Sequence, residues 1–212
     1  MFNFEKIKII KTKGMTLVET LVAVMIFILG IGGFTMLASK SWRMNSFVIE
    51  SGNATSKATR ALTATIKSLR KIKQADDGSY PIKEVGPNSL TVYLDDDNDK
   101  ITERVHYYYE SSTQTFKKGV TKPSSNPVTY QSSDQTVTVV TNYVVNTTSQ
   151  PVFQYYNNNY PADTTNNPLV NPVPANIRLV KLRLWVNIKP LTAPENINLE
   201  SFAEFRNLNE NN

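Results

Sequence analysis

The chain of 212 residues contains no cysteine and a single histidine, His106. Without cysteine, disulfide bonds, thiolate catalysis and cysteine-ligated zinc sites are excluded. One histidine is too few for a multi-histidine metal site, and no Ser-His-Asp, Cys-His, phosphate-loop or paired-carboxylate arrangement is visible. His106 lies in an apparent strand, ERVHYYYE, where a hydrogen-bonded or exposed side chain is the expected role. The sequence therefore predicts no enzymatic activity.

Proline is missing from the first third of the chain, since all eleven prolines lie at or beyond Pro81. The longest apolar run lies before residue 40, whereas the middle and end are rich in Asn, Thr, Ser, Tyr and Val. Because proline interrupts helices, its absence is compatible with one long helix at the start. The chain therefore consists of two unlike parts.

The formal net charge of +5 suggests a polyanionic partner, but the distribution of the charge argues against one. Four lysines and one acidic residue precede Gly14, and without this segment 19 basic and 17 acidic residues remain, a net charge of +2. Most of the basicity thus belongs to a short N-terminal leader. Binding to nucleic acid is not expected.

Residues 15–38, MTLVETLVAVMIFILGIGGFTMLA, form an apolar run in which Glu19 is the only ionisable residue. As a helix this run is about 36 Å long, enough to cross the hydrocarbon core of a lipid bilayer, which is about 30 Å thick. The lysines on its N-terminal side predict a cytoplasmic N-terminus, with everything after about residue 40 facing outward. A secretory signal peptide is not expected, because its apolar core is shorter than this run and is followed by a small-x-small cleavage site. We therefore expect a single-pass membrane protein.

A plain membrane anchor explains neither Gly14, at the junction of leader and apolar run, nor Glu19. The stretch KGMTLVET, residues 13–20, resembles the processing site of type IV prepilins and of type II secretion pseudopilins. The resemblance covers about residues 11–38 and implies that a prepilin peptidase cuts between Gly14 and Met15, after which Met15 is N-methylated. It also makes Glu19 the fifth residue of the mature chain, where this class carries its glutamate. One departure is the lack of the helix-breaking proline that the family often has.

A carboxylate at the centre of a membrane helix is unfavourable by roughly 2.5 to 3.5 kcal/mol, and by less near the helix end, so Glu19 needs a partner. Cleavage frees the α-amine of Met15, whose reference pKa near 8 keeps it largely protonated. In a filament, this amine meets Glu19 of a neighbouring subunit and sets the register. The alternative role of Glu19 is an interfacial acid that reaches the lipid headgroups. The resemblance implies as partners a prepilin peptidase and methyltransferase, other pilin subunits and an inner-membrane assembly platform.

After the apolar run, the helical pattern continues without proline to about Gln74. Gly78 and Pro81 in QADDGSYP are the predicted stop signals. One apolar stripe recurs every three or four positions. It consists of Ala54, Ala58, Leu62, Ile66 and Leu69. The predicted organisation is a basic leader at 1–14, a transmembrane helix at 15–38, an amphipathic helix at 39–75 and a globular head at 76–212.

The head is rich in β-branched and aromatic residues, which is typical of strands. The predicted strands are 89–94, 101–110, 136–145, 151–156, 176–188 and 199–206. Alternate residues from Val180 to Ile188 form an apolar face that we expect to pack on the helical stripe. Irregular loops are predicted at 121–135 and 157–176. The predicted fold class is α+β, a long N-terminal helix packed on an antiparallel sheet, which agrees with the lollipop shape that the resemblance to pilins implies.

The acidic stretch LDDDNDKITE contains Asp95, Asp97 and Asp99 at alternate positions, followed by Glu103. Alternating carboxylates also open the calcium loop of EF-hands. However, that loop has glycine at its sixth position and glutamate at its twelfth, where this chain has lysine and histidine. Two interpretations stay open, a polar hairpin turn and a weak external calcium site; no other cofactor is expected.

Together these features predict a non-enzymatic structural subunit of a type IV pilus, closer to a minor than to a major pilin. One alternative is a pseudopilin of a type II secretion or DNA-uptake system. Another is a single-pass anchored domain that binds a ligand outside the cell. Two roles stay open for the irregular loops. They are either the site of adhesion or partner recognition, or passive surface loops.

Overall fold

The computed structural model describes residues 14–188, 196–205 and 208. These residues form a long α-helix, a short 3₁₀-helix and eight β-strands, so the chain belongs to the α+β class, as predicted. In chain order the elements are α1 (Leu17–Leu69), β1 (Ile82–Val85), β2 (Ser89–Leu94), β3 (Glu103–Glu110), β4 (Thr115–Thr121), β5 (Thr136–Thr141), β6 (Phe153–Tyr156), η1 (Pro174–Asn176), β7 (Leu179–Val186) and β8 (Ile197–Glu204). Of the predicted leader at 1–14, Gly14 alone is among the described residues.

The chain divides into two compact units, residues 1–48 and residues 49–212. In the first unit the described residues comprise Gly14 to Thr16 and the beginning of α1, and every side chain there except Phe47 is exposed. This part of the helix therefore has an apolar surface on all sides that is not buried in a hydrophobic core of the first unit. The second unit contains the rest of α1 and all eight strands.

The strands of the second unit form two antiparallel sheets. Each of β1 to β5 pairs with the next along the chain in a five-stranded sheet, and β6, β7 and β8 form a three-stranded sheet. The prediction of one sheet is wrong because the chain turns away after β5. Tyr143 has a positive φ of 62°, and Val144 then forms a bridge with Val186 of β7. The predicted strand at 136–145 accordingly ends at Thr141.

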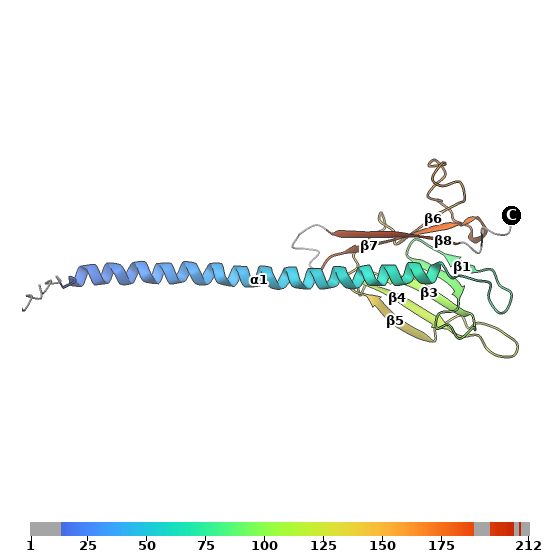
Figure 1. Ribbon diagram of the computed structural model, residues 1–212, viewed down its shortest axis with the longest axis horizontal. Coiled ribbons are helices and arrows are strands. Elements are labelled where there is room, and N and C mark those ends of the chain that lie inside the picture. Colours follow the sequence, from blue (N-terminus) through green and yellow to red (C-terminus); the bar gives the residue numbers. More distant parts are fainter. Residues whose placement is uncertain (1–13, 189–195, 206–207, 209–212) are drawn as a thin grey trace, which may run out of the picture. The chain divides into compact units, whose positions relative to one another are not determined.

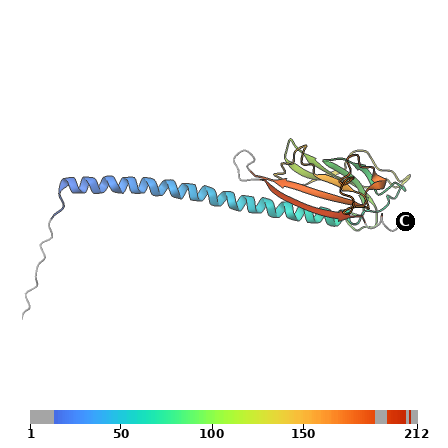
Figure 2. The same cartoon turned by 90° about the horizontal axis from the view of Figure 1, so that it is seen from above.

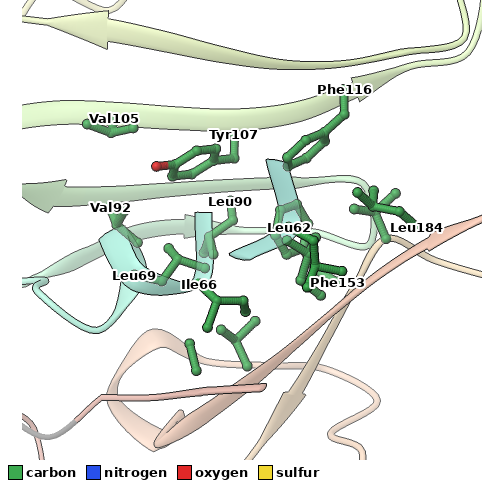
Figure 3. Close-up of a cluster of buried hydrophobic side chains, with 14 of the residues drawn as sticks. Leu62, Ile66, Leu69, Leu90, Val92, Val105, Tyr107, Phe116, Phe153 and Leu184 are labelled. Carbon is green, nitrogen blue, oxygen red and sulfur yellow. The ribbon is translucent and has the colours of Figure 1, made fainter. Parts of the chain in front are cut away.

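One face of α1 and the inner faces of both sheets share a hydrophobic core. Figure 1 shows the last turns of α1 beside both sheets, and in Figure 2 they lie alongside the orange and red strands β7 and β8. The predicted stripe of α1 is buried from Ala54 to Leu69. In Figure 3, Leu62 and Ile66 lie among side chains of both sheets, including Phe116 and Phe153. Burial of each such large side chain stabilises the head by about 1.5 to 3 kcal/mol.

Strand β7 has the alternating face that the sequence predicts. Val180, Leu182 and Leu184 are fully buried and belong to the same cluster as the α1 stripe, which confirms that the two share one core. The opposite face of β7 is also buried or half-buried. Lys181 is 9% exposed, because its Nζ lies 2.8 Å from Glu200 Oε2 on the neighbouring strand β8.

Helix α1 ends at Leu69, earlier than the predicted end at Gln74. Lys71 N donates a hydrogen bond to Ser68 O at 2.9 Å, which closes the last turn. Lys73 N then donates to Tyr93 O of β2 at 3.0 Å. The segment after the helix therefore bonds to the five-stranded sheet instead of continuing the helical ladder.

Strands β1 and β4 lie outside the predicted segments. Strand β4 reads TFKKGVT, and its lysines and glycine have low β propensity. It forms because β3 and β5 pair with it on both sides, a long-range effect that no local pattern reveals. Residues 122–135 and 157–173, within the predicted loops at 121–135 and 157–176, contain no helix or strand, whereas Thr121 belongs to β4 and Pro174–Asn176 form η1.

Candidate functional site

The residues predicted for processing and assembly lie at the N-terminal end of α1. Gly14 and Met15 precede the helix and are exposed. Thr16 is the N-cap residue, and its Oγ1 accepts a hydrogen bond from Glu19 N at 3.3 Å. In return, Thr16 N donates to Glu19 Oε2 at 3.4 Å. This reciprocal pair is a capping box, which satisfies two backbone donors that the start of a helix otherwise leaves free.

Glu19 thus has a hydrogen-bond partner inside its own chain. Its position in the first turn is also favourable because the partial positive charge of the helix N-terminus attracts a carboxylate. The sequence contains the signal for this role, since residues 16–19 read T-x-x-E, the pattern of a capping box.

Among the described residues, α1 is the one helix long and apolar enough to cross a membrane. Its apolar part has no buried side chain among the described residues: Leu17 and Met36, for example, are each 79% exposed. Exposed apolar surface of this extent is typical of lipid contact or of contact with other protein chains.

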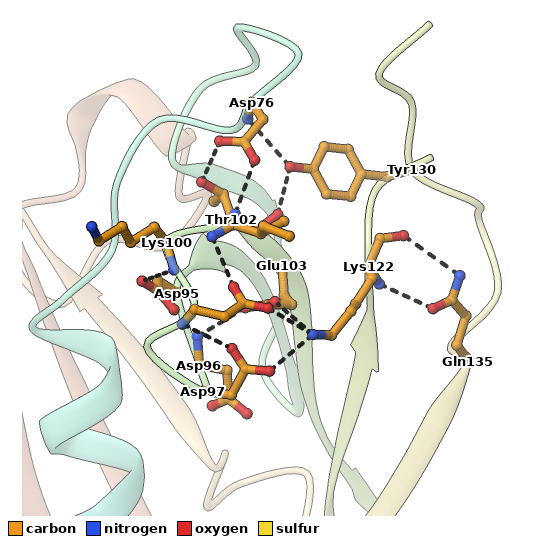
Figure 4. A network of polar contacts seen from close by, with 12 residues as sticks. Asp76, Asp95, Asp96, Asp97, Lys100, Thr102, Glu103, Lys122, Tyr130 and Gln135 are labelled. Atoms are coloured by element: carbon orange, nitrogen blue, oxygen red, sulfur yellow. Dashed lines mark hydrogen bonds and ion pairs between the residues drawn. The ribbon is translucent and has the colours of Figure 1, made fainter. Parts of the chain in front are cut away.

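A second group of predicted residues lies in the hairpin loop between β2 and β3, shown in Figure 4. Carboxylate oxygens of Asp95, Asp97 and Asp99 lie within 4.8 Å of one another. Glu103, at the start of β3, accepts a hydrogen bond from Asp96 N at 2.9 Å through its Oε2. The structure therefore gathers all four predicted acids at one hairpin.

Lys122, immediately after β4, places a positive charge against this hairpin. Its Nζ lies 2.9 Å from Asp97 Oδ2, 2.9 Å from Asp99 Oδ2 and 3.7 Å from Glu103 Oε1. Hydrogen bonds to the two aspartates raise the pKa of Lys122. The sequence does not reveal this contact, because Lys122 is far from the hairpin along the chain and only the pairing of β3 with β4 brings it there.

Glu103 is buried, with its side chain 1% exposed. Burial raises the pKa of its carboxyl group, although the hydrogen bond from Asp96 N opposes that effect. Two buried carboxylate oxygens of this hairpin, Glu103 Oε1 and Asp95 Oδ1, accept no hydrogen bond. Such oxygens are unfavourable in the interior unless a cation compensates them.

The loop departs from an EF-hand at its sixth position, Lys100, and its twelfth position, His106, and the backbone accounts for the first departure. Lys100 has a φ of 75°, the left-handed conformation that glycine adopts most easily at a sharp turn. Its N–H donates to Asp95 Oδ2 at 3.1 Å. The second departure remains, because His106 takes the place of the glutamate ligand and lies on β3 with its Nδ1 3.0 Å from Asp134 Oδ2. The loop is therefore an acidic hairpin and not an EF-hand.

Next to the hairpin, Asp76 binds Thr102, the residue before β3, as Figure 4 also shows. Its carboxylate accepts hydrogen bonds from Thr102 N at 2.9 Å and from Thr102 Oγ1 at 2.6 Å. Tyr130 completes the network by donating its hydroxyl hydrogen to Thr102 O at 2.7 Å. The hydrogen bond from the Thr102 hydroxyl lowers the pKa of Asp76 below its ordinary value of 3.8.

Asp76→Asn should lower the melting temperature at neutral pH, because the ionised carboxylate is the stronger acceptor for both Thr102 donors. Since the pKa of Asp76 is lower in the folded chain, its contribution is complete above the unfolded value of 3.8 and is lost as pH falls through the folded value. Thermal unfolding of the full chain in detergent from about pH 7 to about pH 3 should show the difference from wild type shrinking with acidity. Thr102→Val should show the same trend, and a difference independent of pH would contradict this role.

An ion pair with little exposure lies on the five-stranded sheet near Gly119. Arg104 Nη2 is 2.9 Å from Asp134 Oδ1, and these side chains are 5% and 14% exposed. The other oxygen of Asp134 contacts His106, which confirms the predicted role of that histidine as a hydrogen-bonded strand residue. Gly119 on β4 leaves room for the carboxylate, since a Cβ there would lie 2.1 Å from Asp134 Oδ2.

The structure thus presents two candidate sites. One is the capped, exposed start of α1 with Gly14, Met15 and Glu19, and the other is the acidic hairpin with Lys122. No family model matches the chain, and neither a curated protein nor a solved structure matches it.

Proposed function

We propose that the chain is a structural subunit of a type IV pilus, similar to a minor pilin, which is cut between Gly14 and Met15 and assembles through α1. One observation carries the proposal: the apolar part of α1 is exposed throughout and has a single carboxylate, Glu19, in its first turn. A lipid bilayer and a bundle of similar helices are the two surroundings that suit such a surface.

The position of Gly14 supports processing. Gly14 and Met15 are exposed and lie outside the helix, so the bond between them is open to a peptidase. Apart from its two chain neighbours, no described residue has an atom within 4 Å of the Cβ that another residue would have at position 14. Packing within the described chain therefore does not require glycine there, whereas recognition by a prepilin peptidase would.

The start of α1 supports a role for Glu19 in assembly. Cleavage creates a positive amine on Met15, directly before the N-cap residue Thr16, where the helix dipole disfavours positive charge. In an apolar filament core, this amine needs a carboxylate close by. Glu19 of a neighbouring subunit supplies it in the proposed assembly, while the capping box holds the first turn in a helical form.

The proposed location follows from the charge distribution. The leader lysines keep the N-terminus in the cytoplasm, the apolar part of α1 spans the bilayer, and the head lies outside. The proposed partners are a prepilin peptidase with methyltransferase activity, an assembly platform in the inner membrane and other pilin subunits. A pseudopilin of a secretion or DNA-uptake system would use the same residues in the same way.

Mass spectrometry of the mature N-terminus tests this function. When the full chain is produced with an active prepilin peptidase, we expect it to begin at Met15 and to carry one added methyl group. Gly14→Val should retain the leader, because a β-branched side chain replaces the junction glycine. Gly30→Ala, a matched change inside the apolar part of α1, should be processed like wild type because nothing lies within 4 Å of that position. A wild-type chain that keeps residues 1–14 beside an active peptidase would show instead a membrane-anchored domain of another kind.

A further inference from the structure

The acidic hairpin carries more negative charge than its protein contacts neutralise. Asp95, Asp97, Asp99 and Glu103 contribute four carboxylates, and Lys122 is the cation that contacts three of them. Asp96 does not share this cation, because Lys118 pairs with it at 2.6 Å through Asp96 Oδ2. Carboxylates this close repel one another strongly where solvent screening is weak.

Burial makes the excess charge more costly. Glu103 Oε1 belongs to a side chain that is 1% exposed, points toward Lys122, and has no hydrogen-bond donor. Its distance of 3.7 Å from Lys122 Nζ is too long for a hydrogen bond. Asp95 Oδ1 is a second buried oxygen without a donor in the same hairpin. A bound divalent cation would compensate buried carboxylate oxygens of this kind.

We propose that this hairpin is a calcium site with Asp95, Asp97, Asp99 and Glu103 as ligands. Oxygens bound to one Ca²⁺ at 2.3 to 2.6 Å lie no more than about 5 Å apart. The three aspartate oxygens already lie within 4.8 Å of one another, so binding needs little movement of the loop. All four ligands are hard oxygen donors, and the single histidine of the chain pairs with Asp134 instead.

Calcium suits this loop better than magnesium. Ca²⁺ accepts six to eight oxygens in irregular geometry, whereas Mg²⁺ requires a near-ideal octahedron and keeps several waters. Carboxylates on alternate residues of a turn, with Asn98 and Lys100 at φ 62° and 75°, offer several oxygens around one point without octahedral order. The partial exposure of Asp97 and Asp99 leaves room for water to complete the coordination.

Lys122 is then a competitor of the ion. Its ammonium group takes the place of the metal ion, because it contacts carboxylate oxygens that the ion would use. Removing it should therefore weaken the folded head in the absence of calcium and strengthen calcium binding. A hairpin stabilised by Lys122 alone would show only the first of these effects, so the variant separates the two roles.

Calorimetric titration and thermal unfolding of the full chain in detergent, after treatment with chelator, test the site. We expect a dissociation constant on the order of 10⁻⁴ to 10⁻³ M, as for extracellular modules. About 10 mM Ca²⁺ should raise the melting temperature by about 3 °C or more. Lys122→Met should melt lower than wild type in chelator, gain more from calcium and bind it at least about threefold more tightly. Asp97→Asn, at a side chain 49% exposed, should fold normally and lose most of the calcium response.

Lys117→Met is the matched control, because Lys117 lies on β4, the strand that ends just before Lys122, and its Nζ is 2.8 Å from a carboxylate outside the hairpin, Glu110 Oε2. It should leave the calcium response unchanged. The absence of heat and of a thermal shift in both wild type and Lys122→Met would overturn the proposal. An equal shift with Mg²⁺ at the same concentration would overturn it too. Neither outcome bears on the proposed assembly through α1, since the test involves no filament.

Discussion

Replacing Glu19 with glutamine should reduce incorporation of the chain into filaments by about a hundredfold. Loss of one partner from a buried ion pair is unfavourable by about 3 kcal/mol or more, which corresponds to that factor in an equilibrium constant. Glutamine serves as well as glutamate in a capping box, so Glu19→Gln retains the hydrogen bond from Thr16 N. The variant therefore removes the charge and leaves the start of α1 intact.

Thr16→Ala is the complementary variant. It removes the N-cap hydroxyl, which lowers helix stability by about 0.5 to 2 kcal/mol, but keeps the charge of Glu19. We expect incorporation close to wild type. The measurement compares the amount of chain in sheared filaments with the amount in the membrane fraction of pilus-producing cells. Normal incorporation of Glu19→Gln together with failure of Thr16→Ala would show that Glu19 acts only as a capping residue.

Gly119→Ala should lower the free energy of unfolding of the head by about 3 kcal/mol or more. The added Cβ would lie 2.1 Å from Asp134 Oδ2 and 2.8 Å from Asp134 Cβ, far inside contact distance. Asp134 would have to move, but Arg104 and His106 hold both of its oxygens. The substitution therefore separates Arg104, which is 5% exposed, from its counterion.

Denaturant unfolding of the full chain in mild detergent measures this effect. Gly52→Ala is the control, because Gly52 lies within α1 and no atom is within 4 Å of its added Cβ. Alanine is the better helix former by about 1 kcal/mol, so this variant should be as stable as wild type or slightly more stable. Equal stability of Gly119→Ala and Gly52→Ala would refute the tight contact with Asp134.

The sequence predicts elements well where the local pattern and the tertiary contacts agree. The stripe of α1 from Ala54 to Leu69 and the alternating face of β7 are regular enough to reveal their buried sides. Strand β4 could not be predicted, because its lysines and Gly119 favour no strand until β3 and β5 pair with it. The second sheet could not be predicted either, since it depends on a left-handed turn at Tyr143, a residue type that seldom adopts one.

The candidate sites show the same limit. Spacing alone places Asp95, Asp97 and Asp99 together, because they alternate within one short loop. It does not reveal that Glu103 is buried or that Lys122 approaches from β4, because both depend on the register of β3. The capping box, by contrast, is a local pattern between Thr16 and Glu19 and was open to prediction from the sequence.

The exposure of the apolar part of α1 bears on the energetics of the proposed filament. Side chains such as Leu29 and Phe34, 68% and 72% exposed, find equivalent surroundings among lipid tails and among neighbouring helices. Exchanging one for the other changes the hydrophobic free energy little. Transfer of a subunit between the bilayer and the proposed filament would then be close to balanced in free energy, so that externally applied work would set its direction.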